Sequence, residues 1–450
     1  MPTLSDARAV LLRHFGFPDF RPSQREVVRS VLSGRDTLAV LPTGAGKSAC
    51  FQVPALLLDG ITVVVSPLIS LMTDQVAACQ RRGIAAAALT SATSPMERLV
   101  VMESLRSRSI RLLYLSPERL AASAGTLRQQ IGTPAMLAVD EAHCISEWGP
   151  DFRPAYRQLG VVRRQLGMPP VAALTGSATP EVRRDITKQL GFRTGASATE
   201  YVASFDRPNL RFHVKPVGSE TERFKTMLAE LDASAPLAIV YTPTRSITEA
   251  VTRAIRLAGY DAVPYHAGLT SEYKLRALQR FTGAQLQVVV ATCAFGMGID
   301  APNVRLVVHW SMPPTLESYY QEAGRAGRDG APARCVMLYR KGDGDRQREQ
   351  LDVTFPPARA VERIWRDAEA AKRAPASLRE SAERLRQELL DASGKADWGP
   401  AKRRRRLAED RIGSVERYAT TRGCRRSALL GYFGERLARC AGCDRCSAGR

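Results

Sequence analysis

The feature that most constrains the fold of this chain is a short apolar run that recurs and ends each time in a turn or a polar motif. Five such runs lie between residues 36 and 202: "DTLAVLP", "ITVVVSP", "IRLLYLSP", "MLAVDEAH" and "VAALTGSATP". Continuous apolar runs of this length predict strands that are buried on both faces, as in a parallel sheet. The segments between them, such as 68–82 and 180–190, have helical spacing. The pattern predicts a doubly wound α/β domain.

The same pattern restarts after "SFDRPNLRFHV", with the runs "PLAIVYTPTR", "AVPYHAG", "LQVVVATCAFG" and "VRLVVHWSMP". We expect a second α/β domain here. Beyond it strand-like runs cease, and 356–411 is rich in Arg, Ala and Glu with breaks at Pro375 and "SGKADWGP". This segment fits a small helix-turn-helix insertion and a charged spacer equally well. The predicted regions are 1–203, 204–341 and 342–450.

The net charge points to a partner. The chain has 65 Lys and Arg against 45 Asp and Glu, a formal charge of +20, and residues 401–450 alone hold 14 basic and 5 acidic residues. Such an excess predicts binding to a nucleic acid, although a general preference for arginine is the alternative. No apolar run is long enough to cross a bilayer, and the N-terminus lacks the pattern of a signal peptide. We expect a cytoplasmic protein without membrane contact.

The hexapeptide "TGAGKS" follows a strand-like run and opens a helical segment. Phosphate-binding loops occur at this position, between a strand and a helix. The glycines of such a loop let backbone N–H groups surround the phosphates. Lys47 is expected to reach the β- and γ-phosphates and Ser48 to hold Mg²⁺. A chance turn is the alternative. The residues predicted to bind nucleotide are Thr43, Gly44, Ala45, Gly46, Lys47 and Ser48.

Two acids, Asp140 and Glu141, end the strand-like run "MLAV". With a phosphate loop upstream, Asp140 is expected to hold Mg²⁺ and Glu141 to orient the attacking water. In the second domain, "QEAGRAGRDG" places Arg325 and Arg328 at i and i+3, which predicts one helical face. Two arginines so placed could act on the γ-phosphate as an arginine finger. A solvated turn and a solvated helix are the respective alternatives.

Cysteines cluster at the C-terminus. Four of the nine, Cys424, Cys440, Cys443 and Cys446, have the spacing C-x15-C-x2-C-x2-C. Four thiolates so spaced suit a closed structural Zn²⁺ site, with an iron–sulfur cluster as the minor alternative. Nearby arginines are expected to form a basic surface for DNA: Arg425, Arg426, Arg436 and Arg439. The other cysteines are interpreted as small buried apolar residues: Cys50, Cys79, Cys144, Cys293 and Cys335.

Seven motifs occur in order: "TGAGKS", "SPLISLMTDQV", "LSPERL", "DEAH", "TGSATP", "ATCAFGMGID" and "QEAGRAGRDG". Together they resemble the motif set of superfamily-2 helicases and specifically of the RecQ family. "FGFPDFRPSQ" is similar to that family's adenine-reading segment, "HCISEWGPDFRP" to its aromatic-rich loop, and the cysteines to its zinc-binding domain. The resemblance covers residues 15–339 and 423–446. It implies two RecA-like domains followed by a small helical zinc-binding domain.

The resemblance also implies roles for single residues. Phe17 would stack on adenine, Gln24 would bond its edge and Arg21 would support that contact. His143, Ser177 and Thr179 would link the acids to the domain cleft. The remaining implied contacts are Gln321, Arg325 and Arg328 on the phosphates and Asp300 near the ribose.

The segment that follows the acids, "HCISEWGPDFRP", joins the Mg²⁺ site to aromatic and basic side chains. Trp148 and Phe152 can stack on bases and Arg153 can pair with phosphate, so strand binding can be signalled to the acids. A purely core role for Trp148, Phe152 and Tyr156 is the alternative. Pro150 stands where the family commonly has histidine, and Ala301 where lysine is frequent.

The resemblance implies an ATP-dependent DNA helicase that uses Mg²⁺ and Zn²⁺, travels 3′-to-5′ on single-stranded DNA and unwinds tailed or forked duplexes, in repair or recombination. Three alternatives remain. One is a DNA-stimulated translocase that unwinds weakly, because no winged-helix segment follows residue 446. The others are an inactive binding protein and an RNA helicase. The sequence identifies no protein partner.

Overall fold

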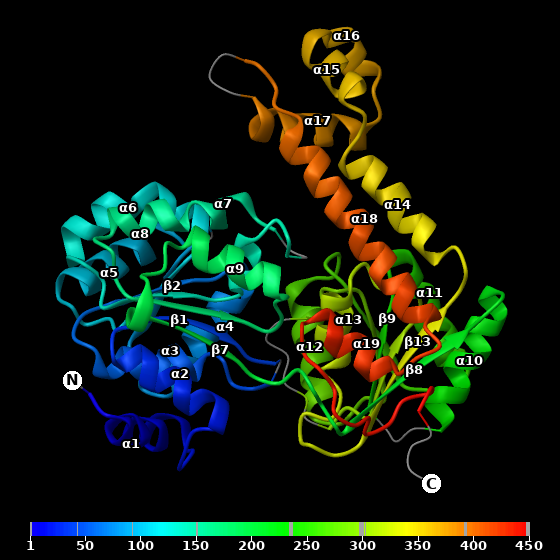
Figure 1. Ribbon diagram of the computed structural model, residues 1–450, viewed down its shortest axis with the longest axis horizontal. Helices are drawn as coiled ribbons and strands as arrows, with labels where there is room; N and C mark the ends of the chain where they lie inside the picture. The colour runs from blue at the N-terminus through cyan, green and yellow to red at the C-terminus, as the bar shows by residue number, and fades with distance from the viewer. Residues whose placement is uncertain are drawn as a thin grey trace. The chain divides into compact units, whose positions relative to one another are not determined.

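The computed structural model describes residues 2–42, 44–91, 93–149, 152–233, 237–296, 301, 303–390 and 394–446. The chain forms two compact units. The first comprises Met1–Arg207, Gly296–Asp300 and Leu430–Leu437, and the second comprises the remainder. Each unit is built on its own sheet (Figure 1).

The sheet of the first unit has seven strands in the order β3-β4-β2-β5-β6-β1-β7, and every pair is parallel. Its strands are β1 (Asp36–Val40), β2 (Thr62–Val65), β3 (Ala86–Leu89), β4 (Leu112–Leu115), β5 (Met136–Val139), β6 (Val171–Thr175) and β7 (Ala198–Val202). Its helices are α1 (Leu4–Phe15), α2 (Pro22–Leu32), α3 (Ala49–Leu57), α4 (Ile69–Arg81), α5 (Pro95–Arg106), α6 (Pro117–Ile131), α7 (Pro154–Arg157), α8 (Leu159–Gln165), α9 (Pro180–Gln189) and the 3₁₀ helices η1 (Ala142–Ile145) and η2 (Gly195–Ser197).

The sheet of the second unit has six parallel strands in the order β10-β11-β9-β12-β13-β8. The strands are β8 (Leu210–Pro216), β9 (Ala238–Tyr241), β10 (Ala262–Tyr265), β11 (Val288–Ala291), β12 (Leu306–His309) and β13 (Ala333–Tyr339). Helices α10 (Glu220–Asp232), α11 (Arg245–Leu257), α12 (Ser271–Thr282) and α13 (Leu316–Ala323) connect them. The two parallel sheets confirm the predicted fold class.

Within the described residues no strand follows β13, which agrees with the end of the strand-like runs in the sequence. Helices α14 (Asp343–Thr354) and α18 (Gly399–Thr420) run side by side in Figure 1, with α15 (Ala358–Arg366), α16 (Ala368–Arg373) and α17 (Ala376–Leu389) at their far end from the sheet. Helix α19 (Arg425–Tyr432) precedes the last three cysteines. Among the helices in the described ranges, none combines the length and apolar content needed to cross a membrane.

The start of β1 is held by a buried ion cluster. Asp36 and Arg163 are both fully buried, with 2.6 Å between the Asp36 carboxylate and the Arg163 guanidinium. Arg193 adds a second ion pair at 2.9 Å, and the backbone N–H groups of Val171 and Arg193 also donate to Asp36. Burial opposes ionisation, but these donors outweigh it and lower the pKa of Asp36 below its usual value. The cluster joins β1, β6, α8 and the segment after α9.

Replacing Asp36 by asparagine should destabilise the first unit by about 3 kcal/mol, because it leaves the buried Arg163 charge uncompensated. The measurement is the free energy of the first unfolding transition in urea. The matched control is Asp19→Asn, which removes a carboxylate that is 42% exposed and pairs with Arg8 and Arg25. The control should cost less than about 1 kcal/mol. Equal effects of the two substitutions would contradict the structural role of the cluster.

Candidate active site

The phosphate loop connects β1 to α3. Gly44 and Gly46 have φ angles of +82° and +77°, which are strained for residues with a side chain, so both positions favour glycine. Ser48 is the N-cap of α3 but makes no side-chain capping bond. Lys47 lies close enough to Asp140 for its charge to oppose the rise in the pKa of that acid. Thr43 lies outside the described residues.

The predicted adenine-reading segment contacts the phosphate loop directly. The Gln24 amide donates to the carbonyl oxygens of Ala45 and Gly46 at 2.9 and 3.0 Å and accepts from the Arg21 backbone N–H at 3.0 Å. The Arg21 guanidinium donates to the Gly44 carbonyl. Gln24 is buried, whereas Phe17 is 60% exposed. The glutamine therefore ties α2 to the loop, while the phenylalanine ring is available for stacking.

The two acids after β5 have different environments. Asp140 is buried, and burial together with the neighbouring Glu141 charge raises its pKa to about 7, although Lys47 opposes the shift. Glu141 has φ of +48°, the left-handed region that a residue with a side chain adopts at a cost of about 1–3 kcal/mol. Its carboxylate lies 3.3 Å from Nδ1 of His143.

His143 connects the acids to β6. Its Nδ1 lies 2.8 Å from the hydroxyl of Thr175, and that hydroxyl donates to the Ser177 carbonyl at 3.2 Å. Nδ1 is therefore placed to share a hydrogen bond with the Thr175 hydroxyl, which ties the ring to β6. Ser177 is fully buried, and Thr179 caps α9 by accepting from the Val182 backbone N–H. Thr175 was not predicted from the sequence, because a threonine at the end of an apolar strand carries no distinctive signal.

The loop after the acids has one exposed aromatic ring. Trp148 is 46% exposed, whereas Tyr156 is fully buried and donates to the Asp140 carbonyl at 3.1 Å. The core interpretation therefore holds for Tyr156 and not for Trp148. The Arg153 guanidinium donates to the Pro67 carbonyl at 2.7 Å, and its backbone N–H donates to the Cys144 carbonyl at 3.0 Å. Phe152 is half-buried, and Pro150 lies outside the described residues.

The prediction of one helical face for Arg325 and Arg328 is wrong. Helix α13 ends at Ala323, and both arginines lie in the turns that follow, where Gly327 has φ of +53°. The structure nevertheless brings both close to the buried Tyr241: burial raises the pKa of that tyrosine, and the two guanidinium charges oppose the shift. Tyr241 donates to the Phe295 carbonyl at 2.7 Å. Gln321 is half-buried on α13, and Asp300 lies outside the described residues.

The four clustered cysteines converge. Their sulfur atoms lie within 4.8 Å of one another, and Sγ of Cys443 is 3.9 Å from Sγ of Cys424. A tetrahedral ZnS₄ site with bonds of about 2.3 Å requires sulfurs about 3.8 Å apart. Burial raises the pKa of the Cys443 thiol, but backbone N–H donors outweigh it and lower the pKa to about 7. Burial raises the pKa of Cys440, and hydrogen bonds with neighbouring thiols raise the pKa of Cys446, so the fit to Zn²⁺ rests on the convergence of the four sulfur atoms.

The prediction of a basic surface is wrong for Arg425 and Arg426, because both are buried. Arg425 pairs with Asp444 at 3.0 Å and donates to the Tyr418 and Ala419 carbonyls. Arg426 donates to the Leu210 carbonyl and lies over the Phe212 ring. Arg436 and Arg439 are exposed, as predicted. Cys293 is also exposed, against the prediction, whereas the other four scattered cysteines are buried.

The cysteine loop pairs with the edge of the second sheet. Cys443 forms a parallel bridge with Phe212 of β8, and the Asp444 backbone N–H donates to the Phe212 carbonyl at 3.1 Å. The Asp444 carboxylate accepts from the Val214 backbone N–H at 3.1 Å. Edge strands offer unpaired backbone groups to other chains, so this loop covers part of an otherwise open edge.

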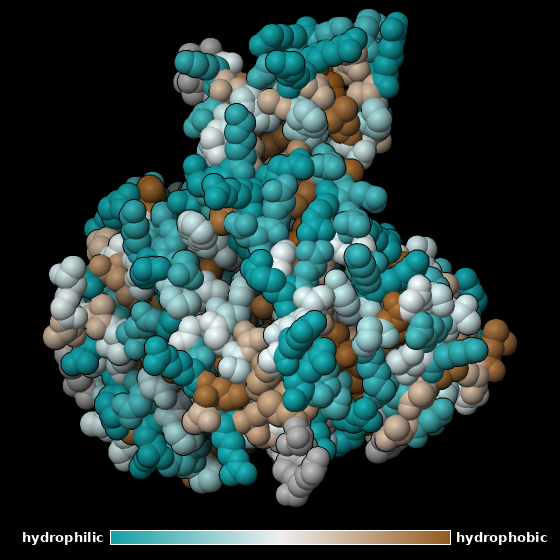
Figure 2. Space-filling model, turned by 45° about the vertical axis from the view of Figure 1, so that its right-hand side comes forward, coloured by the Kyte–Doolittle hydropathy of each residue, from teal (hydrophilic) through white to brown (hydrophobic). Residues whose placement is uncertain are grey.

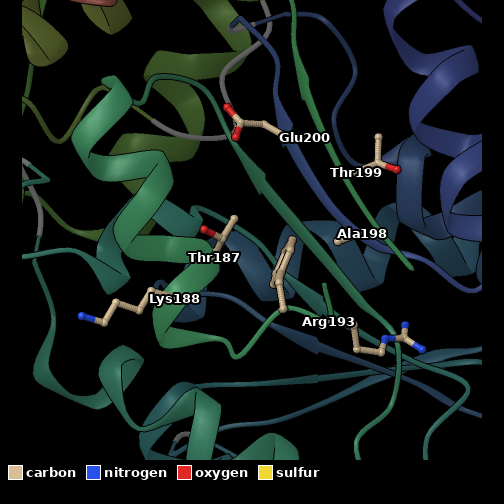
Figure 3. Close-up of a pocket in the computed structure, with 7 residues that line it drawn as sticks. Thr187, Lys188, Arg193, Ala198, Thr199 and Glu200 are labelled. Carbon is tan, nitrogen blue, oxygen red and sulfur yellow. The ribbon is translucent and has the colours of Figure 1, made fainter. Parts of the chain in front are cut away.

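A surface pocket of about 360 Å³ lies elsewhere in the first unit, between α9 and the edge strand β7 (Figure 3). It is lined by Thr187, Lys188, Phe192, Arg193, Ala198, Thr199 and Glu200. None of these is a predicted site residue. The pocket is therefore separate from the candidate nucleotide site.

Three family descriptions match the chain in order. DEAD/DEAH box helicase matches residues 21–186, helicase conserved C-terminal domain matches 222–330, and RecQ zinc-binding matches 381–447. The last match includes all four clustered cysteines.

Relatives match over most of the chain. The ATP-dependent DNA helicase RecQ of Haemophilus influenzae is 37% identical over 442 residues, 98% of this chain and 63% of that protein. The chain thus spans less than two thirds of that relative. The probable ATP-dependent DNA helicase RecS of Bacillus subtilis is 36% identical, with 96% of this chain and 89% of that protein covered. The Mycobacterium smegmatis helicase Lhr bound to single-stranded DNA and AMP-PNP shares the fold, with a TM-score of 0.56, 20% identity and coverage of 92% and 62%.

Replacing Asp444 by asparagine should destabilise the second unit and speed zinc loss to a chelator, although all four cysteines remain. The substitution leaves the buried Arg425 without its carboxylate, at a cost of about 3 kcal/mol. The readouts are zinc release to a colorimetric chelator and thermal unfolding. Arg445→Gln, at the exposed neighbouring position, is the control. Zinc release from the Asp444 variant at the wild-type rate would contradict this role.

Proposed function

The chain belongs to the RecQ family of DNA helicases, and on this premise we propose that it is an ATP-dependent DNA helicase. It couples hydrolysis to 3′-to-5′ movement on single-stranded DNA and to unwinding of tailed or forked duplexes, in DNA repair or recombination. The observation that carries the proposal is the continuity of one short segment. That segment begins at the paired acids and leads to the exposed Trp148 ring.

Nucleotide binding falls to the first unit. Phe17 stacks on the adenine, and Lys47 with the backbone N–H groups of the phosphate loop holds the phosphates. The Gln24 amide donates to two carbonyl oxygens of the loop in this structure. It releases at least one of these hydrogen bonds when it bonds to the adenine edge. The loop then relaxes around the phosphates as the base is bound.

Ser48 and Asp140 fit a Mg²⁺ site. Both present oxygen atoms, which this ion prefers, and the raised pKa of Asp140 reflects a buried carboxylate that lacks sufficient positive charge nearby. Mg²⁺ would neutralise charge on the phosphates when bound. Asp140 and Ser48 would hold it, and Lys47 would hold the adjacent phosphate.

Glu141 orients the attacking water and accepts its proton. Its backbone is in the left-handed region, and its carboxylate lies 3.3 Å from Nδ1 of His143. The hydrogen bond between Nδ1 of His143 and the Thr175 hydroxyl holds the ring in one orientation. Arg325 and Arg328 of the second unit then stabilise charge on the γ-phosphate, with Gln321 beside them.

DNA dependence arises from the loop 148–153. A base that stacks on Trp148 pulls on a segment fixed at Pro67 by Arg153 and at Asp140 by Tyr156. Strand binding therefore changes the position of the catalytic acids rather than their charge.

The test is phosphate release from ATP by the wild type and by Lys47→Ala, with and without single-stranded DNA, alongside unwinding of 3′-tailed and 5′-tailed duplexes. We expect DNA-stimulated release and unwinding of the 3′-tailed substrate, with both activities lost in the variant because the phosphate contact is gone. Stimulation without unwinding would indicate a translocase. Release that does not depend on DNA, or that survives in the variant, would contradict the proposal.

A further inference from the structure

The helices α15–α17 form a small module with its own core. Its buried residues are Val361, Ala382, Leu385, Leu389 and Ala401, with Phe355, Ile364, Trp365 and Trp398 packed against them. Leu390 and Ala396 pair in an antiparallel bridge after α17. A plain charged spacer needs no core, so the core of the described residues favours the small helical insertion over the spacer for 356–411. No residue of this module has a role in the hydrolysis proposed above.

Helix α15 is strongly amphipathic. Val361, Ile364 and Trp365 face the core, whereas Arg359, Arg363 and Arg366 lie at i, i+4 and i+7 and share one exposed stripe. The stripe spans about 10 Å at 1.5 Å per residue. In Figure 2 the visible face of this module is mostly hydrophilic, with hydrophobic side chains showing between the helices.

Exposed helical arginines of this chain fall into two groups. Arg29, Arg184 and Arg276 each pair with an acid one turn away, Glu26, Glu181 and Glu272 respectively. Others, such as Arg98 and Arg253, have no ion pair with a described residue. Arg359 and Arg363 have no ion pair with any described residue, and Arg366 has only a 3.5 Å contact with Glu362 while its side chain stays 81% exposed. Lys402, one turn after Trp398 on α18, is also exposed and has no ion pair within the described ranges. The module thus carries uncompensated positive charge.

The aromatic residues of the module are engaged internally. Trp365 and Trp398 stack at 5.6 Å between ring centroids, Trp365 donates to the Ala382 carbonyl, and Trp398 donates to Glu362. Single-stranded nucleic acids are bound by free aromatic platforms together with cations. With the rings turned inward, the surface offers charges at fixed spacing, which suits the regular phosphates of a duplex.

We propose that the stripe Arg359, Arg363 and Arg366 is a second nucleic-acid site that binds the phosphate backbone of duplex DNA. It goes beyond the proposed helicase activity, because the contact requires neither ATP nor the catalytic acids. A site of this kind holds the duplex while the single-strand track is occupied.

The experiment compares four forms of the full chain without nucleotide: wild type, Arg359→Glu/Arg363→Glu/Arg366→Glu, the same three positions changed to lysine, and a remote control. The control is Arg98→Glu/Arg106→Glu/Arg111→Glu, three exposed arginines of the first unit with the same total change in charge. Fluorescence anisotropy gives the affinity for a blunt-ended DNA duplex and for a single strand over a series of KCl concentrations. Circular dichroism confirms folding.

We expect the glutamate variant to bind the duplex at least about tenfold more weakly, with a slope of log affinity against log salt smaller by about 2–3, because three phosphate contacts are lost. Its affinity for the single strand should match that of the remote control, and the lysine variant should bind the duplex like the wild type. Duplex binding equal to that of the remote control, or equal losses for both DNA forms, would overturn the proposal. Absence of ATPase activity in the wild-type protein would contradict the helicase proposal but not this inference, because the duplex contact requires no ATP.

Discussion

Backbone hydrogen bonding between parallel strands is the interaction on which the candidate site depends. Strand β6 pairs with β1 on one side and β5 on the other, so the phosphate loop, the TGSAT segment and the DEAH acids leave the sheet at one edge. The register is anchored at the opposite edge, where Asp36 of β1 also accepts from Val171 at the start of β6. His143 reaches Thr175 because these strands are neighbours. Formation of the sheet therefore brings these three segments together.

The two acids of the candidate site are held in unfavourable states: the carboxylate of Asp140 is buried beside another acid, and the backbone of Glu141 is strained. Asp140 lies buried beside a second acid, and Glu141 has a left-handed conformation. Both features cost free energy that a more ordinary turn would avoid. They are consistent with a site whose missing positive charge is supplied by its ligands. The cysteine loop in the second unit brings four sulfur atoms within 4.8 Å of one another, and its Asp444 compensates the buried Arg425.

The sequence predicted the central strands well because burial on both faces leaves a continuous apolar run. It missed β3, β7 and β8, which are edge strands with partly exposed residues, and β13, where Arg334 interrupts the pattern and is neutralised by Glu230. Spacing alone could not show that α13 ends at Ala323, because the glycines after it also permit a turn. Nor could it show that Arg425 and Arg426 are buried, since their partners lie as far away as Leu210 in the sequence. Local sequence patterns predict helices and strands, whereas contacts with residues distant in the sequence determine which charged side chains are buried.

The proposed coupling of hydrolysis to DNA depends on the loop from the acids to Trp148. It is tested most directly by phosphate release by Trp148→Ala over a range of single-stranded DNA concentrations. We expect an unchanged rate without DNA, and roughly 5- to 150-fold more DNA to reach the same stimulation, because a stacking contact of about 1–3 kcal/mol is removed. Leu257→Ala, at a side chain that is 90% exposed in the second unit, should behave like the wild type. Full stimulation of the Trp148 variant at wild-type DNA concentrations would contradict the account.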